Sequence, residues 1–414
     1  MRLYKQELLR IIKSTRTRVV IVLAILLPIV LALLATEFND ANYWDNDGNT
    51  ISLHGTDALK FIEESSESGN GEVTIDRLKE ALGTYQRLYD EYGMDPLGSG
   101  FPLNVYWEQV NPIRPMLRMI TQAYSPVNES FDLYQMDPDE LDSFYDDCGK
   151  KLAAVMQSDD ILKDPEILHY AETLYKKVEA PFAIFHGYTR DAFDYIEFTI
   201  FVLAILSASL AAPVFSERYA SGEDSVLRCT VFGRRKFVRT TFLAELTVVS
   251  GVYLVGIGAH LLLSDTEFGF WTLKESVQSL YTVYSLPSMN LFELQIALAF
   301  AGWICCVSVA SASLCISSVV SETSTAMVLS LMVVFIPTLL YSVSGNASWL
   351  IAIFPSASIG LSNNMLMSLV DLRFLTIGNM VFWYPVVLMV TAIAGGCIFW
   401  MLAHLAYSRH QITR

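Results

Sequence analysis

The feature that most restricts this chain is a basic segment followed directly by a long uncharged apolar run. Six Lys or Arg residues and a single Glu lie between Met1 and Arg18, and the next 17 residues, Val19 to Ala35, carry no charge. An apolar run of about 20 residues is long enough to cross a bilayer as a helix. Basic flanking residues stay in the cytoplasm, so this pattern predicts a membrane protein with a cytoplasmic basic segment.

Five further apolar runs predict five more transmembrane helices. The first span is expected to remain as an anchor rather than a cleaved signal peptide, because its basic region is long and no A-x-A site closes it. A shorter apolar piece ends at Pro355 and predicts a re-entrant or interfacial element within residues 344–379. The predicted spans lie near residues 19–36, 196–215, 240–263, 291–319, 325–343 and 380–407.

The net charge of −15 is distributed unevenly. Residues 37–195 contain 31 Asp or Glu and 12 Lys or Arg, which gives this segment a charge of −19, and the remainder is weakly basic. Such acidity keeps the segment soluble and argues against nucleic-acid binding. Asp137-Pro138 and Asp164-Pro165 each supply an N-cap followed by proline at the first helical position. The segment therefore predicts a mostly α-helical domain with its own core.

Three basic segments determine the expected orientation: residues 1–18, the loop 216–239 and the tail after Arg409. With six crossings all three lie on one side, which should be the cytoplasm. The acidic segment 37–195 then faces outward. The predicted fold is an all-α polytopic membrane protein with six transmembrane helices and a large, mostly α-helical extracellular domain between the first and second.

Residues 1–18 are expected to form a cytoplasmic amphipathic helix on the inner membrane surface. One face would be apolar and the other basic. The apolar face would carry Leu3, Leu8, Ile11 and Ile12, and the basic face Arg2, Lys5, Arg10 and Lys13.

The loop 216–239 carries the most specific pattern. Phe215-Ser216-Glu217 ends the second span, Gly222 follows five residues after the glutamate, and a short amphipathic stretch leads to Gly233-Arg234. This arrangement resembles the type-2 ABC transporter permease family. The resemblance covers the membrane part and does not cover the outer domain.

The resemblance implies that this loop holds a coupling helix that docks on a separate cytoplasmic ATPase. Family members often carry a lysine near the start of the third span, where this chain has Arg239-Thr240-Thr241, so no role is transferred to the two threonines. A solvated, positive-inside connection is the simpler alternative. The residues expected to couple are Glu217, Gly222, Val226, Leu227, Arg228, Gly233, Arg234 and Arg235.

The chain does not contain the phosphate-binding pattern G-x-x-x-x-G-K-[ST]. We therefore expect it not to be an enzyme and to bind no cofactor, with ATP and Mg²⁺ held by the partner ATPase. The resemblance further implies two ATPase subunits, a second identical or related permease, and a bacterial plasma membrane.

Two polar residues, Glu245 and His260, fall within the third predicted span. An ionisable group inside a bilayer is a functional-site hypothesis by default. The simpler interpretation of Glu245 is an ion pair with Arg239 or with a partner subunit. Small residues in the third and fourth spans allow either a sliding or dimer interface or ordinary bundle packing.

No metal site is predicted. Residues 45–49 begin like a calcium loop, but the glycine is misplaced and Thr56 stands where a bidentate glutamate is needed. Glu166, His169 and Glu172 share one helix face but lack the H-E-x-x-H pair of a zinc site.

The function predicted is the permease subunit of an ATP-driven exporter of an amphipathic or peptide-like substrate, such as an antimicrobial peptide. The alternative is a non-transporting sensor, in which the ATPase moves the outer domain. A hydrolase would need a converging nucleophile or metal set, which the sequence does not offer.

Overall fold

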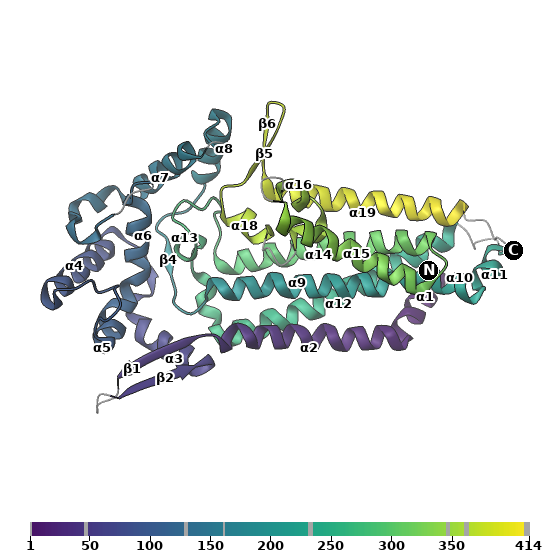
Figure 1. Ribbon diagram of the computed structural model, residues 1–414, viewed down its shortest axis with the longest axis horizontal. Coiled ribbons are helices and arrows are strands. Elements are labelled where there is room, and N and C mark those ends of the chain that lie inside the picture. Colours follow the sequence, from purple (N-terminus) through teal and green to yellow (C-terminus); the bar gives the residue numbers. More distant parts are fainter. Residues whose placement is uncertain are drawn as a thin grey trace.

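The computed structural model describes residues 2–44, 49–127, 131–159, 162–230, 235–344, 348–359 and 364–409. The molecule is elongated, with a bundle of long helices joined end-on to a smaller helical domain (Figure 1). Within the described residues six helical segments are long and apolar enough to cross a membrane, which confirms the six predicted spans. They are α2 (Thr15–Glu37), α9 with α10 (Arg190–Ala211, Pro213–Ser221), α12 (Arg235–Phe268), α14 (Leu291–Val319), α15 (Thr323–Val343) and α19 (Tyr384–Arg409).

The remaining elements are shorter and connect or extend these helices. The described residues include three two-stranded antiparallel sheets: β1–β2, β3–β4 and β5–β6. The elements are α1 (Arg2–Lys13), β1 (Asp40–Trp44), β2 (Thr50–His54), α3 (Gly55–Ser66), β3 (Gly71–Glu72), α4 (Ile75–Tyr92), α5 (Leu103–Val105), α6 (Arg114–Tyr124), α7 (Phe144–Ser158), α8 (Pro165–Tyr175), β4 (Ala183–Ile184), α11 (Glu223–Arg228), α13 (Val277–Leu280), α16 (Ser348–Ala352), α17 (Pro355–Ser358), α18 (Asn364–Val370), β5 (Phe374–Ile377) and β6 (Met380–Trp383).

One predicted span begins later than expected. The sixth was placed at residues 380–407, but its helix starts at Tyr384, because the apolar run before it is strand β6. This strand pairs with β5 across Gly378 and Asn379, and Gly378 has a φ of 63°. A two-residue Gly-Asn connection between apolar runs is a hairpin signal, since glycine adopts positive φ without strain.

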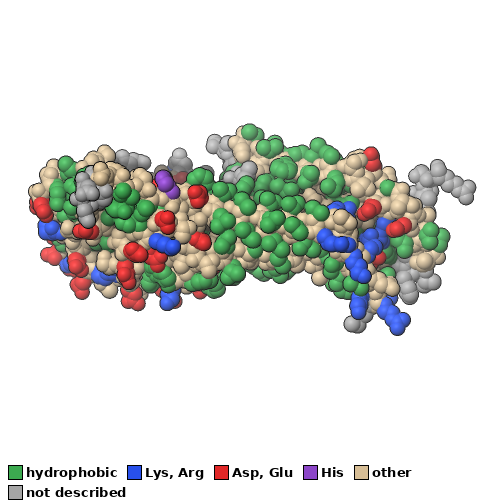
Figure 2. All heavy atoms as spheres, turned by 90° about the horizontal axis from the view of Figure 1, so that it is seen from below, with side chains coloured by type: hydrophobic (Ala, Val, Ile, Leu, Met, Phe, Trp, Pro, Cys, Tyr) green, Lys and Arg blue, Asp and Glu red, His purple; other side chains and the backbone are tan. Residues whose placement is uncertain are grey.

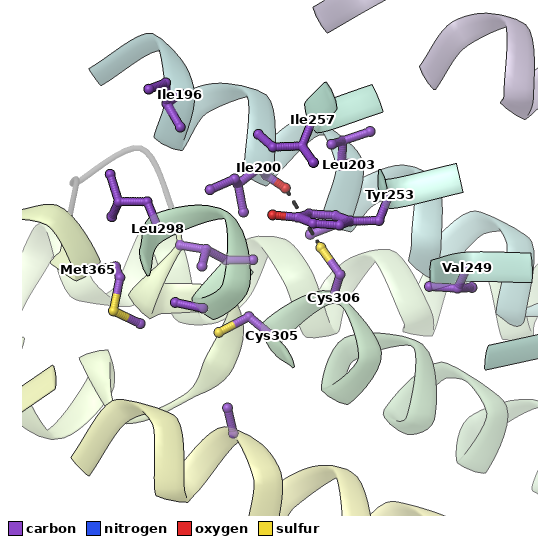
Figure 3. Packing of buried hydrophobic residues seen from close by; sticks show 14 of the residues in the cluster. Ile196, Ile200, Leu203, Val249, Tyr253, Ile257, Leu298, Cys305, Cys306 and Met365 are labelled. Atoms are coloured by element: carbon purple, nitrogen blue, oxygen red, sulfur yellow. Dashed lines mark hydrogen bonds between the residues drawn. The ribbon is translucent and has the colours of Figure 1, made fainter. Parts of the chain in front are cut away.

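Helices α9 and α14 form the centre of the bundle, and the other spans surround them (Figure 1). Tyr253 of α12 lies beside Ile200 of α9 and Cys306 of α14 (Figure 3). Its hydroxyl donates a hydrogen bond of 2.7 Å to the carbonyl of Ala299. Gly302 makes this possible, because a Cβ there would lie 2.5 Å from the Tyr253 hydroxyl. The buried small residues of α14 therefore serve packing within one chain, as the simpler of the two interpretations had it. They are Ser308, Ala310, Ser311, Ala312, Ser313, Ser317 and Ser318.

The segment between α2 and α9, residues 38–189, is called here the inserted domain. Its helices α4, α6 and α7 share one apolar core around Leu82, Leu117 and Phe144, each of which is fully buried. The segment is mostly helical, as predicted, and its apolar core also takes in Val283 from the loop between α12 and α14. The hairpin β1–β2 was not predicted because Asp40 and Asn42 interrupt the alternation in β1, and the pair β3–β4 was not predicted because strands of two residues are too short to show alternation.

Charge separates along the long axis of the molecule. Figure 2 shows Asp and Glu side chains gathered over the inserted domain, a broad apolar belt over the helices, and Lys and Arg side chains at the far end. Helices α1, α10 and α11 and the last turn of α19 all lie at this far end (Figure 1). We call it the basic end, and the end that carries the inserted domain the acidic end.

The segment predicted as re-entrant, residues 344–379, contains three short helices followed by the β5–β6 hairpin. Helix α17 packs against α14, α15 and α19. Side chains satisfy its backbone and that of its neighbours: Thr338 donates to the Ser356 carbonyl at 3.1 Å, and Asn364 donates to the Ala357 carbonyl at 2.8 Å. The backbone of α17 is thus hydrogen-bonded within the protein, whereas the residues of the β5–β6 hairpin are half-buried or exposed.

Candidate coupling site

The second span bends where it reaches the basic end. Pro213 lacks an N–H and so weakens the ladder between α9 and α10. The Ser317 hydroxyl of α14 accepts bonds from the backbone N–H groups of Phe215 at 2.9 Å and Ser216 at 3.1 Å. The Tyr219 hydroxyl donates to the Ser318 carbonyl at 3.0 Å. The bend is therefore fixed to the end of α14.

Gly222 forms the corner between α10 and α11. Its φ is 75°, and a Cβ there would meet no atom within 4 Å. The glycine is needed for its backbone conformation rather than for space, because L residues rarely adopt this φ. We call α10, Gly222 and α11 the elbow.

One face of α11 is buried by charged and aromatic contacts. The Arg228 guanidinium donates to Asp224 at 2.5 Å and to the Tyr407 carbonyl of α19 at 2.8 Å. The Tyr407 hydroxyl donates to the other Asp224 oxygen at 2.5 Å, and the guanidinium lies 4.4 Å from the centre of the Tyr407 ring. Arg228, which the sequence placed on the contact surface, therefore attaches the elbow to α19.

The other face of the elbow is open. Val226 is 69% exposed and the Glu217 side chain is 58% exposed. Leu227 is half-buried and packs against the bundle, so it does not share the outer face with Val226 as the sequence suggested. Gly233 and Arg234 lie outside the described residues, and Arg235 is exposed at the first residue of α12.

Helix α1 is joined to the elbow by buried charge. Arg218 of α10 donates to the Glu7 carboxylate at 2.6 Å, with side-chain exposures of 3% and 11%, and its guanidinium lies 4.4 Å from the centre of the Phe237 ring. Arg10 reaches the same carboxylate at 3.3 Å. Glu217 pairs with Arg16 at 3.5 Å.

The helix predicted within residues 1–18 is confirmed, but its packed face differs from the predicted one. Tyr4 and Glu7 lie on this face, and the Tyr4 hydroxyl is 2.8 Å from Thr247 of α12. Ile12, expected there, is 41% exposed. The reason is that α1 packs against protein through a polar contact as well as through apolar residues.

The two polar residues predicted inside the third span are both buried. The Glu245 carboxylate has no hydrogen-bond partner among the described residues. Its expected pairing with Arg239 is not found, because six residues at about 100° each place the two side chains on different faces of α12. His260 lies between helices, with Nδ1 2.9 Å from the Thr199 hydroxyl and 3.2 Å from the Pro28 carbonyl.

A further buried acid, Glu197 of α9, escaped the sequence analysis. Its carboxylate accepts a bond of 2.6 Å from the backbone N–H of Leu366, near the start of α18. It therefore ties the second span to the segment before α19. Glu197 is the second residue of the predicted span 196–215. It could have been found by the rule that selected Glu245, which treats an ionisable residue inside a span as a candidate site.

At the acidic end, Arg118 of the inserted domain and Arg190 at the start of α9 both bind the loop between α12 and α14. Arg190 donates to the carbonyls of Leu280 at 2.8 Å and Tyr281 at 2.6 Å, and Arg118 donates to the Ser279 carbonyl. Glu275 is buried beside them, and burial raises the pKa of its carboxyl to about 8. The hydrogen bond from Ser279 and the nearby positive charge of Arg118 lower this pKa, but by less than burial raises it.

A hollow of about 510 Å³, a usual size for a ligand pocket, opens between the inserted domain and the β5–β6 hairpin. Its walls are mostly apolar and include Leu162, Ile167, Phe374 and Tyr384, with Arg373 among them. Residues from the inserted domain, α15 and α19 meet here. A molecule bound in this hollow would contact both parts of the protein.

Within the described residues no group of three or more His, Cys, Asp or Glu side chains is placed to hold a metal ion. The calcium-like stretch falls on residues 45–48, which lie outside that part of the chain.

These features define a six-span membrane protein in which the second span is followed by an elbow with one buried and one exposed face. The family described as ABC-2 family transporter protein matches residues 1–393, and the chain belongs to this family. The match includes the inserted domain, so the relationship extends beyond the membrane part to which the sequence resemblance was restricted. No curated protein matches the chain. Membership implies an ATPase partner.

Proposed function

We propose that the chain is the permease subunit of an ATP-driven exporter, coupled at the elbow to a separate cytoplasmic ATPase that binds ATP and Mg²⁺. The observation that carries the proposal is the two faces of α11. The Asp224–Arg228 face is bound to α19, and the Val226 face is open. A connection that served only to join two spans would not need buried ion pairs on one side.

The proposed orientation puts the basic end in the cytoplasm and the inserted domain outside. The supporting facts are the gathering of Lys and Arg at one end and the even number of spans (Figure 2). Force applied to the elbow would pass through Arg218 to α1 and through Arg228 to α19. A second permease subunit, identical or related, would complete the transport path.

The proposed substrate is an amphipathic or peptide-like molecule. Aromatic residues of the inserted domain, which could hold a cationic substrate, pack on one another: Tyr43 stacks on Phe61 at 4.9 Å, and Phe61 meets Trp107 at 5.0 Å. The hollow between the inserted domain and the hairpin is the better candidate, because it is apolar and lies where the domain meets the bundle. The acidic surface would steer cationic substrates toward it.

The coupling role is tested by Val226→Asp. Leu227 is left unchanged because it packs against the bundle. A tagged chain is purified from its native membrane, and the bound ATPase is quantified by mass spectrometry and ATP hydrolysis. A carboxylate placed in an apolar groove without a partner costs several kcal/mol, about a hundredfold or more in affinity. We expect the ATPase to be lost.

The matched control is Leu97→Asp. Leu97 is 41% exposed and lies in the inserted domain, so the same change of charge occurs at the opposite end. This variant should retain the ATPase. Equal retention by both variants would show that α11 is not the docking surface.

A mechanotransmission subunit is the second candidate. The observation that favours it is the attachment of the inserted domain to the loop between α12 and α14 through Arg118, which would let the domain follow movements of these two helices. Inside-out vesicles separate the two functions. ATP-dependent accumulation of a labelled cationic amphipathic peptide supports export. An ATP-dependent change in protease cleavage near Ser279, measured in nanodiscs where both ends of the protein are accessible, without accumulation in the vesicles, supports mechanotransmission.

A further inference from the structure

A groove lies on the outside of the bundle between α12 and α19, with α14 as its floor. Its volume is about 340 Å³, within the range of small-molecule sites. Apart from the hydroxyls of Ser308 and Ser311, its lining is apolar or sulfur-bearing. The walls include Phe242, Leu246, Trp303, Ile393, Gly396 and Trp400.

A second hollow of about 260 Å³ continues the groove toward the basic end. Trp400 lines both hollows, so they are neighbours. The second is lined by Arg239 and His404 together with Met401 and Leu405. The apolar groove therefore ends in a basic mouth.

The groove has the length of one leaflet. Ala392 and Trp400 of α19 mark its two ends, and eight residues of helix span about 12 Å. Half of the hydrocarbon core of a bilayer is about 15 Å thick. The groove thus matches an acyl chain in the leaflet at the basic end.

The mouth carries positive charge that is not neutralised within the described part of the chain. Arg239 is exposed and forms no ion pair with any described residue, and Arg235 is exposed one turn earlier. The Nε2 atom of His404 is buried without a hydrogen-bond partner among the described groups. No acidic residue lines either hollow.

We propose that these two hollows form a binding site for one anionic phospholipid, with an acyl chain in the groove and the phosphate at Arg239 and His404. Anionic headgroups are attracted to juxtamembrane arginines by about 1 kcal/mol each. A second copy of the chain is a poorer occupant, because an apolar helix would bury the Arg239 guanidinium without a counter-charge. The site does not depend on the ATPase or on export.

The test uses Trp400 as the reporter in the full-length protein. Nanodiscs are prepared with either phosphatidylglycerol or phosphatidylcholine brominated on the acyl chains, which quench tryptophan on contact. Subtracting the fluorescence of Trp400→Phe from that of the wild type gives the signal of Trp400 without that of the other six tryptophans. We expect the association constant at this site to be about five-fold larger for phosphatidylglycerol than for phosphatidylcholine, which corresponds to ~1 kcal/mol for one arginine.

Arg239→Gln should abolish that preference, and Arg2→Gln should preserve it. Arg2 is exposed at the start of α1 and lines neither hollow, so the two variants lose the same charge at the same end of the molecule. Cys397→Phe, on the exposed wall of the groove, should reduce quenching by both lipids without a change of charge.

Equal quenching of the wild type by both lipids would overturn the proposal, because the groove would then be ordinary bilayer contact. Absence of quenching by either lipid would also overturn it, since a protein segment would then occupy the groove. Retention of the preference in Arg239→Gln would exclude Arg239 as the headgroup ligand.

Discussion

The two ends of the helical bundle are both held together by arginines, but the arginines have different partners. At the basic end, Arg218 and Arg228 bind the carboxylates of Glu7 and Asp224. At the acidic end, Arg190 and Arg118 bind backbone carbonyls of the loop between α12 and α14. The contact between α10 and α1 depends on the side chains of both Arg218 and Glu7, whereas the contacts at the acidic end depend on the arginine side chain alone.

The difference has an energetic consequence. Removing one member of a buried ion pair leaves the other charge without compensation, which is far more costly than the net value of the pair. A carbonyl that loses an arginine still has its neutral dipole and can accept a bond from water near the surface. The basic end should therefore be sensitive to substitution of its arginines, and the acidic end more tolerant.

The largest effect is expected for Arg218→Met. The Glu7 carboxylate would keep only the contact with Arg10, and we expect a loss of about 3–5 kcal/mol in the free energy of unfolding. The matched change at the acidic end, Arg190→Met, should cost about 1–2 kcal/mol, because its partners are two carbonyls and the Tyr281 ring, none of which is left as an unpaired charge. Thermal unfolding of both variants in the same detergent measures the contrast.

The double variant Glu7→Leu with Arg218→Met sharpens this test. It removes both charges and should recover most of the loss, because no buried carboxylate remains. Similar costs for Arg218→Met and Arg190→Met would remove the distinction between the two ends.

A pH dependence of intermediate size is expected at the acidic end. The folded-state pKa of Glu275 is raised to about 8, above its ordinary value of 4.5, so folding favours the protonated carboxyl. Stability should therefore fall as the pH rises from about 5 to 8, by at most about 1.4 kcal/mol per pH unit. Glu275→Gln should remove this slope.

Protease cleavage near Ser279 at pH 6 and pH 8 reports this dependence. In the wild type the loop should be cleaved faster at pH 8, whereas in Glu275→Gln the two rates should agree. A wild-type rate that does not change with pH, measured with a protease of equal activity at both values, would show that ionisation of Glu275 does not affect the attachment.

The smallest effect is expected for Tyr407→Phe. This change removes the hydroxyl that binds Asp224 and keeps the ring beneath Arg228, so the cost should be about 1.5–2 kcal/mol. Tyr253→Phe is the control, because its hydroxyl binds the neutral carbonyl of Ala299 and should contribute about 1 kcal/mol. A smaller cost for Tyr407→Phe than for Tyr253→Phe in thermal unfolding would argue against a special role for charged partners.

The six spans were predictable because a bilayer imposes one strong requirement, a long apolar helix. The corner at Gly222 was predictable for a similar local reason, the conformational freedom of glycine. The residue at which α19 starts could also have been found, since Gly378-Asn379 signals the hairpin before it.

The buried charges of the elbow were not predictable. Arg218 and Arg228 lie in a charged loop, where solvated side chains are the usual expectation. Their burial depends on Glu7 and Tyr407, which are distant in the sequence and belong to different helices. The unpartnered state of Glu245 likewise depends on how α12 turns its faces toward its neighbours.

The pairing of Glu7 with Arg218 also orders events during synthesis. The two residues are 211 positions apart. At a translation rate of about 5–20 residues per second, Arg218 is added about 10–40 s after Glu7. During that interval α1 has no elbow to pack against, and its basic residues must find the lipid surface first. The ribosome thus completes the whole inserted domain before the amino-terminal helix can reach its final partner.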